Sequence, residues 1–282
     1  MLVLRRDPAQ FGYECSRWQL NMLSQSCAWL NVSTASGLSQ LLTRLGISYK
    51  RGRDYVHSPD PNYDAKCSLI ADTHQRVLAE PDRYVLLYHD ELTYYRQPTL
   101  AQGWEATGHC QPLARRSLQA NTHFRTVADL NALTGQVTYC QWSRTSTKRL
   151  ASFWYDIRSA YPCAEMIYVV MDNWPVHYHP DVLAPLQAQH FPFPRTLPAN
   201  WPTDPTGRTP RDNLPIQLLS LPTYASWLNP IEKLWRWLKH QVLHLHRLSD
   251  NWLALRQRVD DFLAQFAHGS LPLLQYVGLL PA

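Results

Sequence analysis

The chain has 282 residues, of which 45% are hydrophobic and 17% are charged, and its formal net charge is +5. This composition excludes intrinsic disorder, which requires low hydrophobicity and high net charge. No window approaches the roughly 18 consecutive apolar residues of a membrane span, and the N-terminus lacks the apolar stretch of a secretory signal. Six scattered cysteines without a Cys-x-x-Cys pair favour reduced thiols over disulfides or a zinc site. We therefore expect a cytoplasmic protein that has no membrane partner.

Basic residues are concentrated in two stretches of the chain. Residues 15–53 contain five basic residues and no acid, and residues 111–149 contain six against Asp129 alone. Such stretches are typical of a surface that binds a polyanion such as DNA. A solvated basic face is the slightly favoured interpretation as long as charge is the only signal. The predicted DNA-binding residues are Arg44, Lys50, Arg51, Arg53, Arg115, Arg116, Lys148 and Arg149.

Residues 1–60 are predicted to form a helical DNA-binding segment. Apolar residues recur at helical spacing in 16–29 and again in 38–45. Two helices joined by a short turn and followed by basic residues are typical of a helix-turn-helix or winged helix. Two amphipathic helices are more often simple packing elements, so this signal is weak by itself. After a Ser-Pro-Asp-Pro break, residues 61–82 are predicted to form a linker helix.

Strand-like runs alternate with helical patterns from residue 83 onward. Residues 84–88 and 166–171 are continuous apolar runs, as expected of central strands buried on both faces. Residues 121–131 and 136–142 are rich in strand formers and are joined by Ala-Leu-Thr-Gly, a hairpin signal. This alternation favours an α/β fold with a mixed sheet flanked by helices. The remaining predicted elements are a strand at 214–221, helices at 145–160, 179–189, 230–246 and 249–267, and a Pro-rich loop at 191–213.

Two of the predicted strands end in acidic residues. Asp90 and Glu91 follow the first apolar run, and Asp172 follows the second. Functional groups gather at the carboxyl ends of strands in open α/β sheets, so Asp90 and Asp172 are expected to converge on one metal site. Side chains alternate between the two faces of a strand, so Glu91 is expected to point away from that site.

A third candidate acid is Glu232, in the sequence Asn229-Pro230-Ile-Glu232. Asn229 suits the N-cap of a helix and Pro230 its first position, which would place Glu232 where an acid completes a capping box. Capping and catalysis explain Glu232 equally well at this point. The predicted buried stripe of this helix is Ile231, Leu234, Trp235, Leu238, Val242 and Leu245.

Taken in order, these segments resemble bacterial insertion-sequence transposases of the mariner superfamily. The resemblance rests on His-Asp-Glu at 89–91, on Trp104 with Gly108, on Met-Asp-Asn-Trp-Pro-Val-His at 171–177, and on Leu-Pro-x-Tyr-Ala-x-Trp-Leu-Asn-Pro-Ile-Glu-Lys-Leu-Trp at 221–235. Upstream, Phe-Gly-Tyr, Leu-Leu-x-Arg-Leu-Gly-Ile-Ser-Tyr-Lys-Arg and Ser-Pro-Asp-Pro are similar to the DNA-binding region of that family. The similarity extends over nearly the whole chain.

The resemblance implies a ribonuclease H-like catalytic domain at 83–248, with an insertion near 191–213 and a C-terminal helix and tail at 249–282. It implies a catalytic, metal-binding triad of Asp90, Asp172 and Glu232 with two Mg²⁺ or Mn²⁺ ions. Asn173 and His177 would position the scissile phosphate or orient Asp172. The implied partners are the double-stranded DNA of the element ends and a TA target, bound by a homodimer at the bacterial nucleoid. The family has an earlier helix-turn-helix that is expected to be missing from this chain.

The predicted function is therefore a transposase that cuts DNA at insertion-sequence ends and joins the 3′-ends to target DNA. Three carboxylates from separate elements suit this chemistry, because hard oxygen ligands hold the Mg²⁺ ions that activate the nucleophile and stabilise the leaving oxygen. Two alternatives remain open: a transposase-derived DNA-binding protein without strand-transfer activity, and a metal nuclease unconnected with mobility. Zinc sites at His177 with His179 or at His240 with His244 are disfavoured, because no matching cysteine or acid accompanies them.

Overall fold

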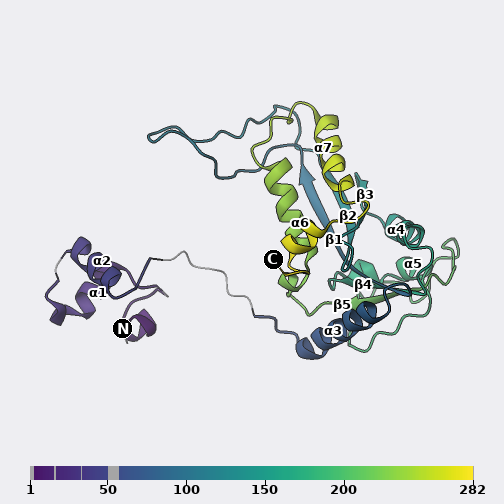
Figure 1. Cartoon of the computed structure of the whole chain (residues 1–282), viewed down its shortest axis with the longest axis horizontal. Helices are drawn as coiled ribbons and strands as arrows, with labels where there is room; N and C mark the ends of the chain where they lie inside the picture. Colours follow the sequence, from purple (N-terminus) through teal and green to yellow (C-terminus); the bar gives the residue numbers. More distant parts are fainter. Residues whose placement is uncertain (1–2, 16, 33, 50–56, 282) are drawn as a thin grey trace. The chain divides into compact units, whose positions relative to one another are not determined.

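The computed structural model describes residues 3–15, 17–32, 34–49 and 57–281 (Figure 1). The chain divides into two compact units, Met1–Tyr55 and Val56–Ala282. A finer division of the second unit at residues 82 and 248 stays a prediction. Among the described residues, no helix is both long enough and apolar enough to cross a membrane.

The first unit is helical, as its sequence predicts. Its elements are the short helices η1 (Val3–Arg5), η2 (Pro8–Phe11) and η3 (Ala28–Leu30), and the α-helices α1 (Leu20–Ser26) and α2 (Ala35–Arg44). The helix predicted over 16–29 is shorter than expected, because the chain leaves helical geometry at Cys27. Thr34 caps α2 by accepting a hydrogen bond from the Gly37 amide, and Leu38 is buried against the rest of this unit.

The second unit is built on a five-stranded mixed sheet with the order β3-β2-β1-β4-β5 (Figure 1). The central strand β1 (Tyr84–Tyr95) pairs antiparallel with β2 (His123–Asn131), which pairs antiparallel with β3 (Val137–Trp142). On its other side β1 is parallel to β4 (Met166–Met171), which is parallel to β5 (Ile216–Ser220). The expected hairpin and buried strands are confirmed, but β1 continues to Tyr95 and does not end before Asp90 as predicted. The parallel strands β1 and β4 carry the candidate acids to one edge of the sheet.

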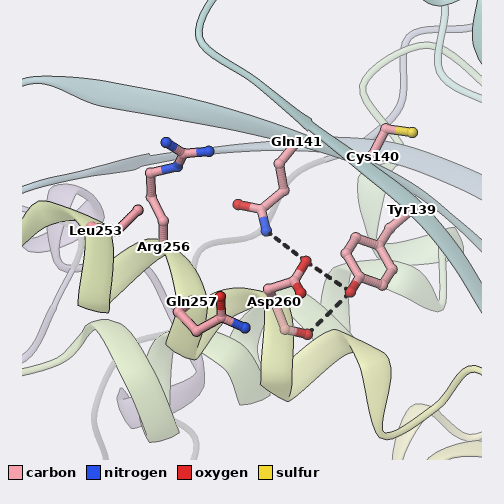
Figure 2. Close-up of a pocket in the computed structure, with 7 residues that line it drawn as sticks. All are labelled: Tyr139, Cys140, Gln141, Leu253, Arg256, Gln257 and Asp260. Atoms are coloured by element: carbon pink, nitrogen blue, oxygen red, sulfur yellow. Dashed lines mark hydrogen bonds between the residues drawn. The ribbon is translucent and has the colours of Figure 1, made fainter.

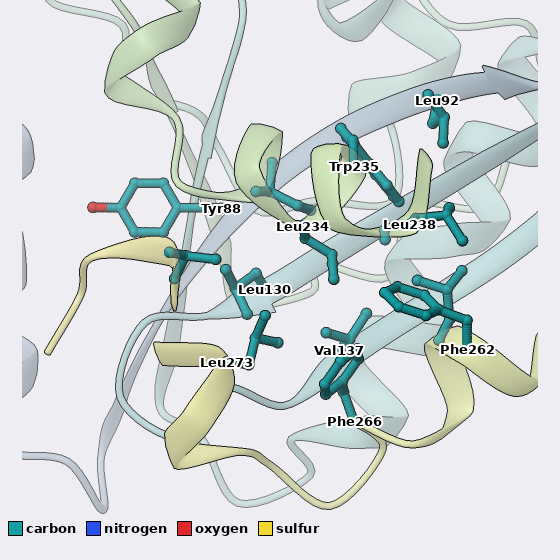
Figure 3. Packing of buried hydrophobic residues seen from close by; sticks show 14 of the residues in the cluster. Tyr88, Leu92, Leu130, Val137, Leu234, Trp235, Leu238, Phe262, Phe266 and Leu273 are labelled. Atoms are coloured by element: carbon teal, nitrogen blue, oxygen red, sulfur yellow. The ribbon is translucent and has the colours of Figure 1, made fainter. Parts of the chain in front are cut away.

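Helices cover both faces of the sheet. One face packs on α4 (Thr147–Ala160) and α5 (Pro180–Leu183), which contribute Phe153, Trp154 and Val182 to the core. The other face packs on α3 (Tyr63–Ala79), α6 (Ile231–Leu238), α7 (Trp252–Ala264) and α8 (Leu271–Val277). Figure 3 shows Trp235 and Leu238 of α6 beside strand β1 in this second core.

Helix α7 also closes the outer edge of the sheet at β3. The Tyr139 hydroxyl donates a 2.9 Å hydrogen bond to the Asp260 carboxylate, and the Gln141 amide donates to the same oxygen at 3.3 Å (Figure 2). These contacts border a polar hollow of about 470 Å³ between β3 and α7. Because the contacts are made by side chains of both elements, they hold α7 on the sheet.

Three local predictions are corrected by the structure. Helix α5 ends at Leu183, so most of the 179–189 helix is absent. Helix α6 passes into a π-helical turn, η6 (Lys239–Leu243), before the backbone changes direction. A π turn shifts the helical phase, so Leu243 is buried where Leu245 was expected. The third correction is α8, which begins at a Ser270 N-cap and was predicted as an irregular tail.

Candidate active site

The strand register places Asp90 and Asp172 at the same edge of the sheet. Tyr88 of β1 pairs with Val170 of β4 in parallel register, and each aspartate lies two residues further along its chain. Parallel neighbours are about 4.8 Å apart. Asp90 still lies within the long strand β1, whereas Asp172 lies just beyond the end of β4. The hydrogen bonds of the sheet therefore hold the backbone of Asp90 directly. Those of β4 end at Met171, one residue before Asp172.

Asp90 points toward α6. Its Oδ2 atom accepts a 2.8 Å hydrogen bond from the indole nitrogen of the buried Trp235. Burial, together with the nearby negative charges of Glu232 and Glu91, raises the pKa of the Asp90 carboxyl to about 7. Asp90 and Glu232, although far apart in sequence, are thus brought close enough to repel each other.

The position of Glu232 is set by Asn229, in a way that the sequence did not suggest. Asn229 is not the N-cap of α6; that position is Pro230, which makes no side-chain cap. The Asn229 side-chain amide instead donates a 2.9 Å hydrogen bond to the main-chain carbonyl of His89. Among the described residues, the Glu232 carboxylate makes no hydrogen bond, so the capping-box explanation is not supported. Its free oxygens leave it available to a ligand.

Asp172 is oriented by two contacts within the turn that follows β4. Its Oδ1 atom accepts a 2.9 Å hydrogen bond from the Trp174 amide and lies 3.3 Å from Nδ1 of His177. Burial opposes ionisation of Asp172, but the hydrogen bond and charge of His177 outweigh it and lower the pKa. The neighbouring Asn173 amide donates to the Leu221 carbonyl at 2.6 Å. Asn173 therefore ties this turn to the segment that leads to α6.

Glu91 does not point away from Asp172, contrary to the sequence-based expectation. Its Oε1 atom lies 2.8 Å from Nε2 of His177 and 3.4 Å from Nε2 of His89. Burial opposes ionisation of Glu91, but the charges and hydrogen bonds of the two imidazoles outweigh it and lower its pKa. Strand alternation separates Glu91 from Asp90 as predicted; the error arose because η4 (Pro175–Tyr178) carries His177 across to the Glu91 side.

The same face of the sheet holds two further buried polar groups that sequence reasoning missed. Nδ1 of His89 lies 3.1 Å from Oδ1 of Asp129, and both side chains are inaccessible to solvent. A lone acid inside the apolar strand β2 was the only available signal. The ligand atoms of His89, Glu91 and His177 lie within 4.8 Å of one another, so these side chains also have the spacing of a metal site.

The donors of the predicted triad suit a hard divalent cation. All three side chains are carboxylates, which Mg²⁺ and Mn²⁺ prefer. Repulsion between Asp90 and Glu232 helps raise the pKa of Asp90, and a bound cation would relieve that repulsion. The Trp235 indole engages one Asp90 oxygen only, and the Trp174 amide engages one Asp172 oxygen. The chemistry of these donors therefore fits the metal that the sequence implies, whereas the described donor atoms that lie within 4.8 Å of one another are those of His89, Glu91 and His177.

The predicted DNA-binding residues occupy separate places in the fold. Arg44 lies exposed in the last turn of α2. Lys50, Arg51 and Arg53 lie outside the described residues. Arg115 and Arg116 are exposed on the excursion between β1 and β2, where the Ser249 hydroxyl donates to the Arg115 carbonyl. Lys148 and Arg149 lie in the first turn of α4.

Comparison with protein families identifies the second unit. The family model for the DDE superfamily endonuclease matches residues 85–255, which is more than half of the chain. The match includes the strands and helices that carry all three predicted acids.

A curated relative supports the same relationship over a longer range. The uncharacterized 39 kDa protein of insertion element IS630 from Shigella sonnei is 22% identical over 261 residues. The alignment covers 90% of this chain but 66% of the relative, so the chain spans slightly less than two thirds of that protein.

Solved structures show the fold. The Mos1 mariner paired-end complex with Mn has a TM-score of 0.62 at 16% identity, covering 97% of this chain and 74% of that chain. The Mos1 strand transfer complex has a TM-score of 0.59 at 15% identity, covering 98% and 75%. The predicted ribonuclease H-like sheet flanked by helices is thus confirmed, together with the likeness to insertion-sequence and mariner proteins.

Proposed function

This chain belongs to the DDE superfamily endonuclease family, and from that premise we propose that it is a DNA transposase. It would cut DNA at the ends of an insertion sequence and join the freed 3′-ends to target DNA at a TA dinucleotide. The relatives support this reading, because one is encoded by an insertion element and the others are described in paired-end and strand-transfer complexes.

The observation that carries the proposal is the approach of Glu232 to Asp90. These acids come from opposite ends of the domain sequence, yet the charge of Glu232 raises the pKa of Asp90. Asp172 joins them at the same sheet edge through the register of β1 and β4. A capping role for Glu232 would require no such approach. We propose Asp90, Asp172 and Glu232 as the catalytic carboxylates and the ligands of two Mg²⁺ or Mn²⁺ ions.

The residues around the three carboxylates have different proposed roles in phosphodiester cleavage. Bound divalent cations supply Lewis acidity that activates the attacking water or 3′-hydroxyl and stabilises the leaving oxygen. Trp235 holds Asp90 by one oxygen, so the other remains directed to a ligand. Asn229 holds the start of α6 on β1 and thereby keeps Glu232 near Asp90. His177 orients Asp172, and Asn173 fixes the turn in which Asp172 lies.

The partners follow from the same proposal. Double-stranded DNA of the element ends and of the target would contact the basic residues Arg44, Lys50, Arg51 and Arg53 in the first unit. Arg115, Arg116, Lys148 and Arg149 would contact DNA near the catalytic unit. Two copies of the chain would bring two element ends together; the Mos1 mariner protein is described in a paired-end complex.

A strand-transfer assay with the flanking repeats of the element tests the proposal. Wild-type protein should cleave at the repeat ends and insert them into a target plasmid in Mg²⁺ or Mn²⁺. Asp172→Asn should abolish both steps while the protein keeps its fold, because the Asp172 side chain is 55% exposed. Binding without cleavage by the wild type would favour a transposase-derived DNA-binding protein, and cleavage without joining would favour a nuclease. Wild-type cleavage by Asp172→Asn would overturn the mechanism.

A further inference from the structure

Five titratable side chains form a continuous chain beneath the candidate active site. Asp129 contacts His89 at 3.1 Å, and His89 lies 3.4 Å from Glu91. Glu91 contacts His177 at 2.8 Å, and His177 lies 3.3 Å from Asp172. Carboxylates and imidazoles alternate along the whole path, so each contact joins a group of one type to a group of the other.

The chain runs from the core to the site. The Asp129 side chain is 0% exposed, those of His89 and His177 are each 1% exposed, and that of Glu91 is 16% exposed. Only Asp172, at the far end, is largely open to solvent. The contacts of His89 with Asp129 and of His177 with Glu91 are hydrogen bonds. Among the described residues, Nε2 of His89 and Nδ1 of His177 make no hydrogen bond, so their contacts with Glu91 and Asp172 are ion-pair contacts. The hydrogen-bonded contacts of a buried polar network rigidify the groups they join. The rigid end therefore lies in the sheet and the exposed end at the proposed metal.

Both imidazoles are also held by aromatic neighbours. The His89 ring lies 5.8 Å from that of Trp154, and the His177 ring lies 5.2 Å from that of Trp174 and 5.3 Å from that of His89. The two histidine rings meet edge to face at 82°. Packing on several sides leaves these rings little freedom to rotate, so their nitrogen atoms keep fixed directions.

Asp172 needs such support because it lies outside the sheet. β4 ends at Met171, whereas Glu91 lies within β1, opposite Val127 of β2. A path from Glu91 through His177 therefore connects Asp172, the member of the proposed triad that lies beyond its strand, to the strand that carries Asp90. Side chains that orient a metal-binding group in this way change metal affinity by about 10–100-fold when they are removed.

We propose that Glu91 is a positioning residue of the active site, which acts through His177 to hold the Asp172 carboxylate in the direction of the metal. The inference rests on the proposed function and assigns a role to a residue outside the triad. His89 and Asp129 anchor Glu91 from the opposite side. The acids at 90 and 91 therefore serve the same centre from opposite faces of one strand, the first as a ligand and the second as a support.

The test measures Mn²⁺ binding and DNA cleavage by the full chain and its variants. Glu91→Ala removes the contact to His177, whereas Glu91→Gln keeps an oxygen at that place and loses only the charge. Asp260→Ala is the matched control, because it removes a half-buried carboxylate on α7 that accepts a hydrogen bond from Tyr139 of β3 and belongs to no part of the proposed site. Electron paramagnetic resonance gives the Mn²⁺ affinity, steady-state cleavage kinetics give kcat and KM for DNA, and circular dichroism confirms folding.

We expect Mn²⁺ affinity to fall by about tenfold or more in Glu91→Ala and by less in Glu91→Gln. The value of kcat should also fall more in Glu91→Ala than in Glu91→Gln, while KM for DNA stays constant. Asp260→Ala should match the wild type in Mn²⁺ affinity, kcat and KM, even if it lowers the melting temperature. A merely structural Glu91 would lower the melting temperature of its variants but leave the Mn²⁺ affinity of the folded protein unchanged.

Three outcomes would overturn the inference in distinguishable ways. Equal Mn²⁺ affinity and kcat in the wild type, Glu91→Ala and Glu91→Gln would overturn the positioning role while leaving the proposed transposase intact. A wild-type protein that binds no Mn²⁺ would overturn the proposed function and the inference together. If purified protein contains about one zinc ion per chain that Glu91→Gln loses, then His89, Glu91 and His177 form a metal site, and the positioning role is wrong.

Discussion

Asn229 and His89, which lie 140 residues apart in sequence, are joined by a 2.9 Å hydrogen bond from a side-chain amide to a main-chain carbonyl. Asn229 is 4% exposed and precedes α6, while His89 precedes Asp90 in β1. Asp90 follows His89 in the sequence, and Glu232 lies three residues after Asn229. The hydrogen bond therefore lies beside the two acids that repel each other. The contact thus sets the distance between a strand and a helix at the place where the proposed chemistry occurs.

Asn229→Leu should reduce both stability and cleavage. The substitution leaves the His89 carbonyl without its partner, which costs about 1–3 kcal/mol in a buried site. It also frees the start of α6, so cleavage should fall at least about tenfold. Asn251→Ala is the control, because Asn251 only caps α7 and should cost about 1 kcal/mol without loss of cleavage by the folded protein. Urea unfolding and a cleavage assay measure both effects; full activity in Asn229→Leu would contradict the assigned role.

Asp90→Asn should stabilise the metal-free protein at alkaline pH. The pKa of Asp90 is raised from 3.8 to about 7, so the folded state holds a proton that the unfolded state has already lost between these values. The free energy of unfolding of the wild type therefore decreases as pH rises from about 4 to about 7. At about 1.4 kcal/mol per pKa unit, Asp90→Asn gains at most about 4 kcal/mol at pH 8 and nothing at pH 4.

Urea unfolding in EDTA at pH 5 and pH 8 measures this difference. Asp72→Asn, at an exposed position on α3, serves as the control and should show the same pH dependence as the wild type. If Asp90→Asn and the wild type show parallel pH dependence, then Asp90 is not held in the environment described above.

Mg²⁺ should raise the melting temperature of the wild type, and more strongly at pH 8 than at pH 6. A cation that binds the folded state alone stabilises it in proportion to the logarithm of its concentration. At pH 6 the proton on Asp90 competes with the cation, because this pH lies below the raised pKa of about 7. Differential scanning fluorimetry with Mg²⁺ and with EDTA provides the measurement. Asp172→Asn should weaken the shift, and an identical shift in that variant would remove Asp172 from the ligand set.

Gly135→Ala should destabilise the β2–β3 hairpin. Gly135 has φ +69°, and a Cβ atom there would lie 2.4 Å from the Ser270 main-chain oxygen at the start of α8. Strain of this kind costs about 1–3 kcal/mol. Gly207→Ala is the matched control, because nothing lies within 4 Å of its Cβ position. Thermal unfolding should separate the two variants by several degrees; equal melting temperatures would show that the α8 contact yields without cost.

Replacing Lys50, Arg51 and Arg53 by alanine should weaken DNA binding and flatten its salt dependence. Each lost phosphate contact lowers the slope of log Kd against log salt by roughly one. Arg83→Ala is a suitable control, since Arg83 already pairs with Glu80 and Glu165. Fluorescence anisotropy between about 50 and 200 mM salt measures the slopes. An unchanged slope in the triple variant would assign this run to a solvated face.

The amino-acid sequence alone determined the elements whose signals are local. The apolar run at 166–171 became β4 with the same bounds, and α3 ends at Ala79 within the helix predicted for 61–82. Strand burial and helix periodicity depend on near neighbours in the chain, so such patterns are visible without a fold. Acids at strand ends, together with the order of the motifs, were enough to indicate the family.

Only the tertiary structure decided how the site is held together. Asn229 was expected to cap its own helix and bonds His89 instead, and Glu91 was expected to face away and contacts His177. Both partners are distant in sequence, so no local pattern could reveal them. A buried amide or carboxylate forms a hydrogen bond with whichever polar group lies beside it in the folded chain. The free-energy cost of leaving the buried group unpaired exceeds the stabilisation from a local hydrogen bond such as a helix cap. The candidate acids could therefore be predicted from the sequence, whereas the groups that orient them depend on the packing of the folded chain.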